Sequence, residues 1–356
     1  MKILQECYNI SFSKITFLER KLKISDKKTL IFGANKVGKS YLIYDFLSNF
    51  RANEYLYIDF SDLRNSNVYT EIEFLQEFIT KNEIKVLVLE NIKTLFTLPK
   101  CEYIIISSLK DINLDEFSKI NLKALDFEEY LLFDNKHQNI TQSFNSFLKH
   151  GNLPEIVFTE DHKKLKRVQE IALLNTKDSV EYEIFKILLE NIDEKKSLFQ
   201  LFNTLKNRIK ISKDRFYEVC KDFEDKQLFY YVPKYNQEKS AKKIYSYNHN
   251  FLSSLNHSKK FKNEFSNMIF LEITKNSEVF YLDLVDFYIK SKKLFILCIP
   301  FFNLDLNMNL LKKVVKTALE MDIAKIEIIT VSNQSKIKNF DINIEAIPFY
   351  EWAVLN

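Results

Sequence analysis

The sequence predicts an α/β protein: a parallel sheet, then a helical region, then a smaller mixed region. Three observations support this prediction. Short apolar runs rich in Val, Ile and Tyr alternate with longer amphipathic stretches in the N-terminal third, an order typical of parallel sheets with crossover helices. The apolar spacing then becomes that of helices, and the last hundred residues return to alternation.

The first region, assigned to residues 1–160, contains four candidate strands. They are TLIF (29–32), YLYIDF (55–60), VLVLE (86–90) and YIIIS (103–107). Each is a continuous apolar run, as expected for a strand covered by helices on both faces. We therefore expect these four runs to form one parallel sheet.

The second region, 161–255, has three stretches with helical apolar spacing, and Ser179 and Ser212 are candidate N-caps for two of them. LFYYVPKY, the polar NQEKSAKK and IYSYN follow. Three helices and a hairpin with a basic tip have the order of a winged helix. The third region, 256–356, reads as mixed α/β, with a helix expected over NLLKKVVKTALEM between apolar runs.

Composition restricts the class of protein only loosely. The chain has 356 residues, with 52 Lys and Arg against 48 Asp and Glu, which neither requires nor excludes a nucleic-acid partner. Its four cysteines lack metal-ligand spacing, so we expect reduced thiols and a cytoplasmic protein. The N-terminus does not resemble a signal peptide, and apolar runs such as LFILCIPFF are too short to span a bilayer, so no membrane association is expected.

Two of the only three glycines in the chain lie five residues apart. The segment GANKVGKS, Gly33 to Ser40, fits G-x-x-x-x-G-K-[ST], the phosphate-binding P-loop. Such a loop must curl so that its backbone N–H groups converge on phosphate oxygens, which needs unusual φ/ψ values and close approach. Lys39 would contact the β- and γ-phosphates and the Ser40 hydroxyl would bind Mg²⁺. The predicted nucleotide-binding residues are Gly33, Ala34, Asn35, Lys36, Val37, Gly38, Lys39, Ser40 and Tyr41.

An acid follows the apolar run at 86–89. Glu90 takes the place of the acid that holds Mg²⁺ in such sites, so Ser40 and Glu90 are the predicted metal ligands. Asn91 takes the place of the second acid, which activates water, and an amide cannot accept that proton. Glu90 and Asn91 are thus the predicted catalytic positions, with nucleotide binding favoured and rapid hydrolysis not. Ser107 or Ser108, where the next run ends, would sense the γ-phosphate.

The loop, KVLVLENIKTL, YIIISS and LKALDFEEYLLF together resemble the prokaryotic AAA+-type ATPases of the archaeal-ATPase group. FLKHGNLPEIV resembles the GGFPEVV segment of that family. MIFLEITKNSEVFYLDLVDFYI, LFILCIPF and IEAIPFYEWAV resemble its C-terminal domain, which is related to restriction-endonuclease folds. The resemblance implies a P-loop ATP-binding AAA-like module (1–160), a winged helix (161–255) and a degenerate PD-(D/E)xK nuclease-like domain (256–356). It also implies ATP and Mg²⁺ as ligands.

The sequence departs from that family at several places. Ser118-Lys119 stands where Gly-Arg is usual, so an arginine finger is not expected there. In the nuclease-like domain Asp286 remains, but Leu284 replaces an acid and Ile296-Leu297-Cys298 replaces the acid–spacer–lysine pattern. Because phosphodiester cleavage needs several carboxylates and a lysine around its metal, nuclease activity is not expected.

Three functional hypotheses remain. The first is a nucleotide-dependent switch with weak or partner-stimulated hydrolysis. The second is an oligomeric ATPase that acts on duplex DNA, and the third is a protein-interaction scaffold with a structural nucleotide. DNA would contact basic residues of the last winged-helix helix and of the hairpin. These residues are Lys213, Arg215, Lys221, Lys234, Lys239, Lys242 and Lys243.

Overall fold

The computed structural model describes residues 1–12, 14–92, 94–137, 139–257, 260–274, 277–338 and 340–355. The chain divides into two units. One comprises Met1–Ala124 with Asp225–Gln227, and the other comprises Leu125–Glu224 with Leu228–Asn356. The limits at 160 and 255, which rest on changes of sequence pattern, remain predictions.

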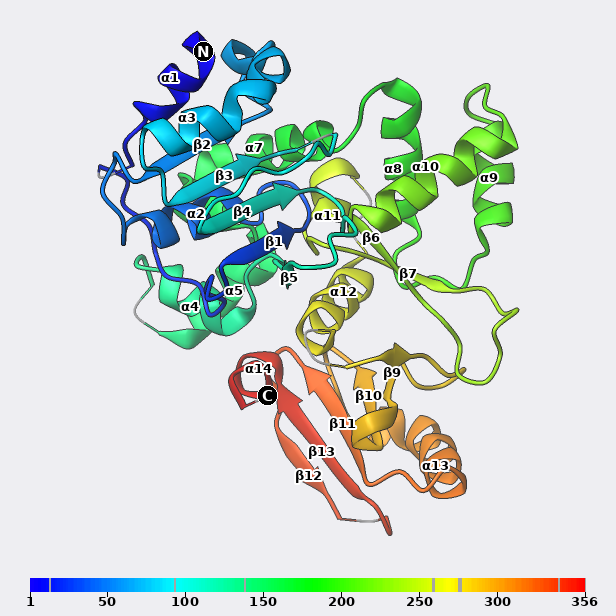
Figure 1. Cartoon of the computed structure of the whole chain (residues 1–356). Coiled ribbons are helices and arrows are strands. Elements are labelled where there is room, and N and C mark those ends of the chain that lie inside the picture. Colours follow the sequence, from blue (N-terminus) through cyan, green and yellow to red (C-terminus); the bar gives the residue numbers. More distant parts are fainter. Residues whose placement is uncertain are drawn as a thin grey trace. The chain divides into compact units, whose positions relative to one another are not determined.

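A five-stranded sheet forms the centre of the first unit (Figure 1). The strand order is β2-β3-β4-β1-β5, and all four neighbouring pairs are parallel. This confirms the predicted parallel sheet and its four apolar strands, and it adds β5, which the sequence did not indicate. The strands are β1 (Lys28–Phe32), β2 (Tyr55–Asp59), β3 (Val86–Glu90), β4 (Tyr103–Ser108) and β5 (Ser118–Asn121).

The helix α1 (Lys2–Tyr8) precedes the first strand. Crossover connections contain α2 (Lys39–Leu47), between β1 and β2, and α3 (Leu75–Lys81), between β2 and β3, with 3₁₀ helices at Leu63–Asn65 and Val68–Phe74 before α3. Every residue of β3 is buried, which explains its continuous apolar run. Because parallel strands end at the same edge of a sheet, Asp59 lies beside Glu90 and Phe32 beside Ser108 in the strand register. That edge carries the candidate site.

The second unit begins with helices. They are α4 (Phe127–Phe133), α5 (Ile140–His150), α6 (Pro154–Phe158), α7 (Asp161–Leu174), α8 (Ser179–Glu190), α9 (Leu198–Lys206) and α10 (Lys213–Asp225). An antiparallel hairpin of β6 (Phe229–Val232) and β7 (Lys243–Ser246) follows α10. The predicted order of three helices and a hairpin is therefore confirmed for α8, α9, α10 and β6–β7.

One of the two predicted N-caps is wrong. Asp178, not Ser179, caps α8: its side chain accepts a hydrogen bond from the backbone N–H of Glu181, and Ser179 is the first helical residue. A carboxylate can reach the free N–H groups of the first turn as a hydroxyl does. Ser212 is confirmed as a capping residue of α10, because its Oγ accepts the N–H of Arg215 at 3.2 Å.

A six-stranded mixed sheet ends the second unit, with the order β12-β13-β11-β10-β9-β8. β11 pairs in parallel with both β10 and β13, and the other pairs are antiparallel. The strands are β8 (Val279–Phe280), β9 (Phe287–Ile289), β10 (Leu294–Cys298), β11 (Lys325–Thr330), β12 (Ser335–Ile337) and β13 (Asn343–Pro348). The helices are α11 (Phe251–Leu255), α12 (Phe261–Ile273), α13 (Leu304–Glu320) and α14 (Phe349–Leu355), with a 3₁₀ turn at Lys290–Lys292. The expected helix at 309–321 is confirmed except for its last residue, since α13 ends at Glu320. No helix among the described residues is long and apolar enough to cross a membrane.

Acid is expected to destabilise the second unit through His249. This imidazole is fully buried, and one ring nitrogen lies 2.9 Å from the Phe147 carbonyl oxygen. Burial lowers the pKa of His249 to about 4. The unfolded chain takes up a proton near pH 6.5 and the native state does not, so stability present above that pH is lost as the pH falls toward 4. The free energy of unfolding should fall by about 3 kcal/mol between pH 7 and pH 4 from this residue.

Urea unfolding of the wild type and of His249→Gln across this pH range measures the effect. The variant should lose less stability than the wild type on acidification, whatever its stability at pH 7. His162→Gln, which changes an exposed histidine of α7, is the matched control and should behave as the wild type. If the free energy of unfolding changes with pH by the same amount in all three proteins, the prediction is wrong.

Candidate functional site

The loop between β1 and α2 has a conformation that requires its two glycines. Gly33 has a φ of 152°, and a Cβ at this position would collide with the backbone carbonyl oxygen of Leu122. Gly38 has a φ of 102° and lies directly before the first residue of α2. L-residues with side chains rarely adopt these conformations. The spacing recognised in the sequence is therefore matched by a curled loop at the N-terminus of a helix.

Lys39 lies inside this curl. Its side chain is buried, and Nζ donates hydrogen bonds of 2.8 Å to the carbonyl oxygens of Gly33 and Ala34. Burial lowers the pKa of Lys39 to about 8, and the nearby charge of Glu90 opposes that shift. The ammonium is thus held beside the loop backbone, where the predicted phosphate site requires a cation.

Arg20 supports the same loop from another part of the chain. It is buried, its Nη1 donates to the Val37 carbonyl oxygen at 2.7 Å, and its Nη2 donates to the Lys123 carbonyl oxygen at 3.0 Å. These bonds join the loop to the segment after β5. The sequence analysis missed Arg20, and no motif around it could have indicated this role.

Ser40, in the first turn of α2, and Glu90, at the end of β3, come together although β4 lies between β3 and β1 in the sheet. The Ser40 hydroxyl donates to Oε1 of Glu90 at 2.5 Å, and the Tyr57 hydroxyl donates to Oε2. Burial raises the pKa of Glu90, while the hydrogen bonds from Ser40 and Tyr57 oppose that shift. Hydroxyl and carboxylate oxygens are hard donors of the kind that Mg²⁺ prefers. These two predicted metal ligands therefore form a donor pair that fits Mg²⁺.

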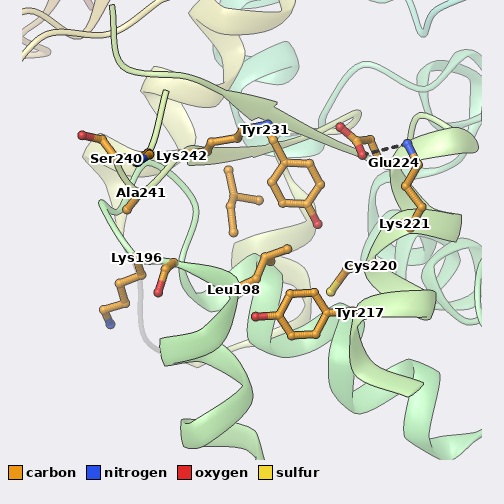
Figure 2. A pocket seen from close by; sticks show the side chains of 13 residues that line it. Lys196, Leu198, Tyr217, Cys220, Lys221, Glu224, Tyr231, Ser240, Ala241 and Lys242 are labelled. Carbon is orange, nitrogen blue, oxygen red and sulfur yellow. Dashed lines mark hydrogen bonds and ion pairs between the residues drawn. The ribbon is translucent and has the colours of Figure 1, made fainter. Parts of the chain in front are cut away.

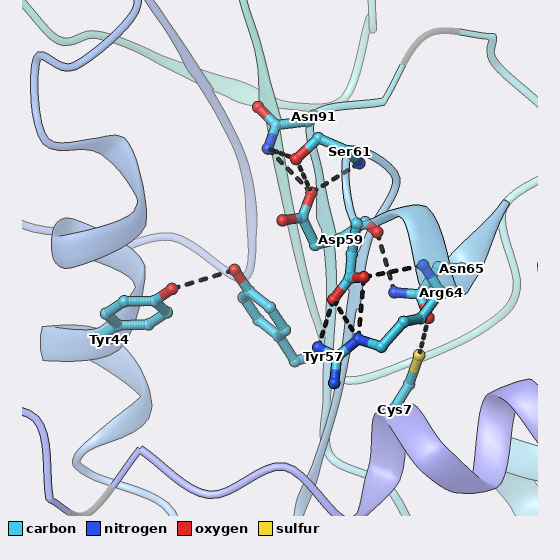
Figure 3. A network of polar contacts seen from close by, with 9 residues as sticks. Cys7, Tyr44, Tyr57, Asp59, Ser61, Arg64, Asn65 and Asn91 are labelled. Atoms are coloured by element: carbon cyan, nitrogen blue, oxygen red, sulfur yellow. Dashed lines mark hydrogen bonds and ion pairs between the residues drawn. The ribbon is translucent and has the colours of Figure 1, made fainter.

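Asn91 belongs to a polar network at the ends of β2, β3 and β4. Its Nδ2 donates to Oδ1 of Asp59 at 2.9 Å and to Oγ of Ser61 at 3.2 Å (Figure 3). Its backbone N–H donates to Oγ of Ser107 at 3.1 Å. The backbone of Asn91 has a φ of 56°, a left-handed conformation that asparagine tolerates better than most residues. Asn91 is thus bound to the neighbouring strands.

The two predicted sensor serines are both buried and hydrogen-bonded within the protein. Ser107 accepts the N–H of Asn91, and Ser108 donates to the carbonyl oxygen of Lys110. Their sensor role stays a prediction. The sequence analysis missed Tyr57 and Asp59, although Asp59 offers a signal of its own: it ends the apolar run of β2 as Glu90 ends that of β3.

Several basic residues that were expected to face DNA are bound to acids. Arg215 pairs with Glu181 at 3.0 Å, and Lys234 pairs with Asp283 at 2.8 Å. Lys243 is 5% exposed, so its predicted position on an open hairpin surface is wrong. Burial of its aliphatic stem and its pairing with acids place it in the interior instead.

Lys243 belongs to a charged cluster in the second unit, in which Lys243 and Asp193 are buried and Lys262 is exposed. Its Nζ lies 2.6 Å from Oδ1 of Asp193 and 3.6 Å from Oδ1 of Asp286. Lys262 Nζ lies 3.7 Å from that same Asp286 oxygen, and the Cys298 backbone N–H donates to its other oxygen at 2.7 Å. Within the described ranges no group of three or more His, Cys, Asp or Glu could hold a metal ion. Two lysines lie close enough to neutralise Asp286.

A cavity of about 380 Å³ lies between α9, α10 and the hairpin (Figure 2). Leu198, Tyr217 and Cys220 are among its lining residues. Burial raises the pKa of the Cys220 thiol to about 12, so it is protonated at neutral pH and a weak nucleophile. At the edge of the cavity Lys221 pairs with Glu224 at 3.2 Å.

No model of a known protein family matches the chain. The uncharacterized protein MJ1544 of Methanocaldococcus jannaschii is 24% identical over 393 residues, with 93% of this chain and 89% of the relative covered. The two proteins are distant homologues. The similarity extends over both units, and the name of the archaeal relative states no activity.

Proposed function

We propose that this chain binds Mg²⁺-ATP at the loop from Gly33 to Tyr41 and acts as a nucleotide-dependent switch with weak or partner-stimulated hydrolysis. The observation that supports it most is the contact between Ser40 and Glu90, at 2.5 Å, beside the buried ammonium of Lys39. Together they offer a cation and two hard oxygen donors where a curled loop meets a helix N-terminus. The choice of ATP rests on the resemblance to AAA+-type ATPases.

The proposal assigns a role to each group of the site. Backbone N–H groups of the loop and the N-terminus of α2 bind phosphate oxygens. Lys39 would neutralise the β- and γ-phosphates, and Ser40 and Glu90 would hold Mg²⁺, which would offset the charge of the phosphates. Arg20 and Tyr57 keep the loop and the Glu90 carboxylate in place.

We also infer that the first unit is an AAA-like module, that α8–α10 with the β6–β7 hairpin form a winged helix, and that the C-terminal sheet is a degenerate nuclease-like domain. The order of their elements supports each inference. A switch requires that nucleotide binds two conformations unequally. Backbone hydrogen exchange with and without Mg²⁺-ATP would reveal which segments respond.

Calorimetric titration with Mg²⁺-ATP is the test of binding. We expect one site per chain, weaker binding when EDTA removes the metal, and a higher melting temperature at saturating nucleotide. Titration with Mg²⁺-GTP provides the comparison of bases. Absence of any heat or thermal shift with either nucleotide would refute the proposal. Phosphate release that duplex DNA stimulates would favour the DNA-acting ATPase over the switch.

A further inference from the structure

The neighbouring strands β2 and β3 end beside side chains that hydrogen-bond to each other, a carboxylate and an amide. Asp59 ends β2, and its register partner on β3 is Glu90, the residue before Asn91. Asp59 and Asn91 are joined by a hydrogen bond of 2.9 Å from the amide Nδ2 to the carboxylate Oδ1. The carboxylate that is absent at position 91 is therefore present one hydrogen bond away, on the adjacent strand.

The orientation of the Asp59 carboxylate is fixed through one of its oxygens. Oδ1 accepts hydrogen bonds from the backbone N–H of Ser61 at 2.8 Å, from its hydroxyl at 2.7 Å and from Asn91. The other oxygen, Oδ2, accepts no hydrogen bond from any described residue and points away from the network (Figure 3). Asp59 is only half-buried. A carboxylate oxygen that is oriented, reachable and open to a donor has the properties of a general base.

We propose that Asp59 is the general base for ATP hydrolysis in this chain and that Asn91 is a positioning residue for it; this inference rests on the proposed function. Oδ2 of Asp59 takes a proton from water while the water oxygen forms a bond to the γ-phosphorus. The bond between that phosphorus and the β–γ bridging oxygen breaks, and its electron pair leaves with ADP. The products are ADP and inorganic phosphate, and the proton on Asp59 returns to solvent.

A structural role for Asp59 is the alternative. Its bonds to Ser61 form a turn that ends β2, and a turn needs only an acceptor oxygen. Asp59→Asn separates the two roles, because asparagine keeps the Oδ1 acceptor for Ser61 and loses the ability to take a proton. Asp62→Asn is the matched control: Asp62 lies in the same segment, and its carboxylate is paired with Arg64.

The experiment measures Mg²⁺-ATP binding by calorimetry and phosphate release under single-turnover conditions, with and without duplex DNA. Asp59→Asn should slow phosphate release by about 10²–10⁴-fold, the usual contribution of a general base, with the dissociation constant for Mg²⁺-ATP unchanged. Asp62→Asn should release phosphate as the wild type does. The exchanged variant Asp59→Asn/Asn91→Asp restores a carboxylate to the pair. It should release phosphate at least ~10-fold faster than Asp59→Asn does.

The outcomes distinguish the two proposals. If the wild type fails to bind Mg²⁺-ATP, the proposed function is wrong. Binding without any phosphate release overturns the role of Asp59 and leaves nucleotide binding intact. Release that Asp59→Asn does not slow also overturns it, and so does a slow Asp59→Asn variant that the exchange cannot rescue, because that pattern indicates a structural requirement for Asp59.

Discussion

Replacing Lys243 with methionine is expected to lower the free energy of unfolding by about 3–5 kcal/mol, the usual cost of breaking a buried ion pair. The side chains of Lys243 and Asp193 are 6% and 5% exposed. Burial alone lowers the pKa of Lys243, but Asp193 and Asp286 outweigh it and raise that pKa. Removing the ammonium leaves the buried Asp193 carboxylate with the Tyr245 hydroxyl, which donates to its Oδ1 at 2.7 Å.

Urea unfolding of Lys243→Met and Lys242→Met measures the difference between two adjacent lysines. Lys242 is exposed, so its variant should stay within about 0.5 kcal/mol of the wild type. The double variant Lys243→Met/Asp193→Asn should recover part of the loss, because it no longer buries an uncompensated charge. Asparagine tolerates the φ of 62° at position 193. A loss below about 1 kcal/mol for Lys243→Met would show that water compensates the acids.

Lys39→Ala is expected to weaken Mg²⁺-ATP binding by at least ~100-fold, because charge-assisted hydrogen bonds contribute about 1.5–3 kcal/mol each. The fold should be kept. The carbonyl oxygens of Gly33 and Ala34 lose a donor, but the cost of burying the ammonium disappears with it. Calorimetry gives the affinity, and thermal unfolding without nucleotide gives the stability.

Lys27→Ala is the control for this variant, since it also removes one positive charge. Lys27 is exposed and directly precedes the first residue of β1, whereas the loop follows the last residue of that strand. If Lys39→Ala binds Mg²⁺-ATP as tightly as the wild type, the loop is not the phosphate-binding site. A large loss of thermal stability that persists with ATP would instead favour the hypothesis of a scaffold with a structural nucleotide.

Local patterns were sufficient for the strands and the loop. The strands β1 to β4 appeared as continuous apolar runs, since each is covered on both faces. Gly33 and Gly38 could be recognised from the sequence because the positive φ angle at each position favours glycine whatever the rest of the fold. Glu90 followed from its place directly after such a run. These predictions depend on residues that are close together in the chain.

The support of the site depends on residues that are far apart in the chain. Asp59 meets Asn91 only because β2 pairs with β3, and Arg20 reaches the loop from 17 residues before Val37. No local sequence pattern predicts either of these two contacts. Lys243 was expected on the hairpin surface because lysine is usually exposed. Its ion pair with Asp193, 50 residues earlier in the chain, stabilises it in the interior instead.

The sequence by itself determined the parallel sheet, the curl of the loop and the acid at the end of β3, because backbone conformation and strand burial are encoded by neighbouring residues. Only the tertiary structure decided which carboxylates and lysines become partners. Strand order and helix packing bring those charges together, and a charge buried in the protein interior is stable only beside its partner.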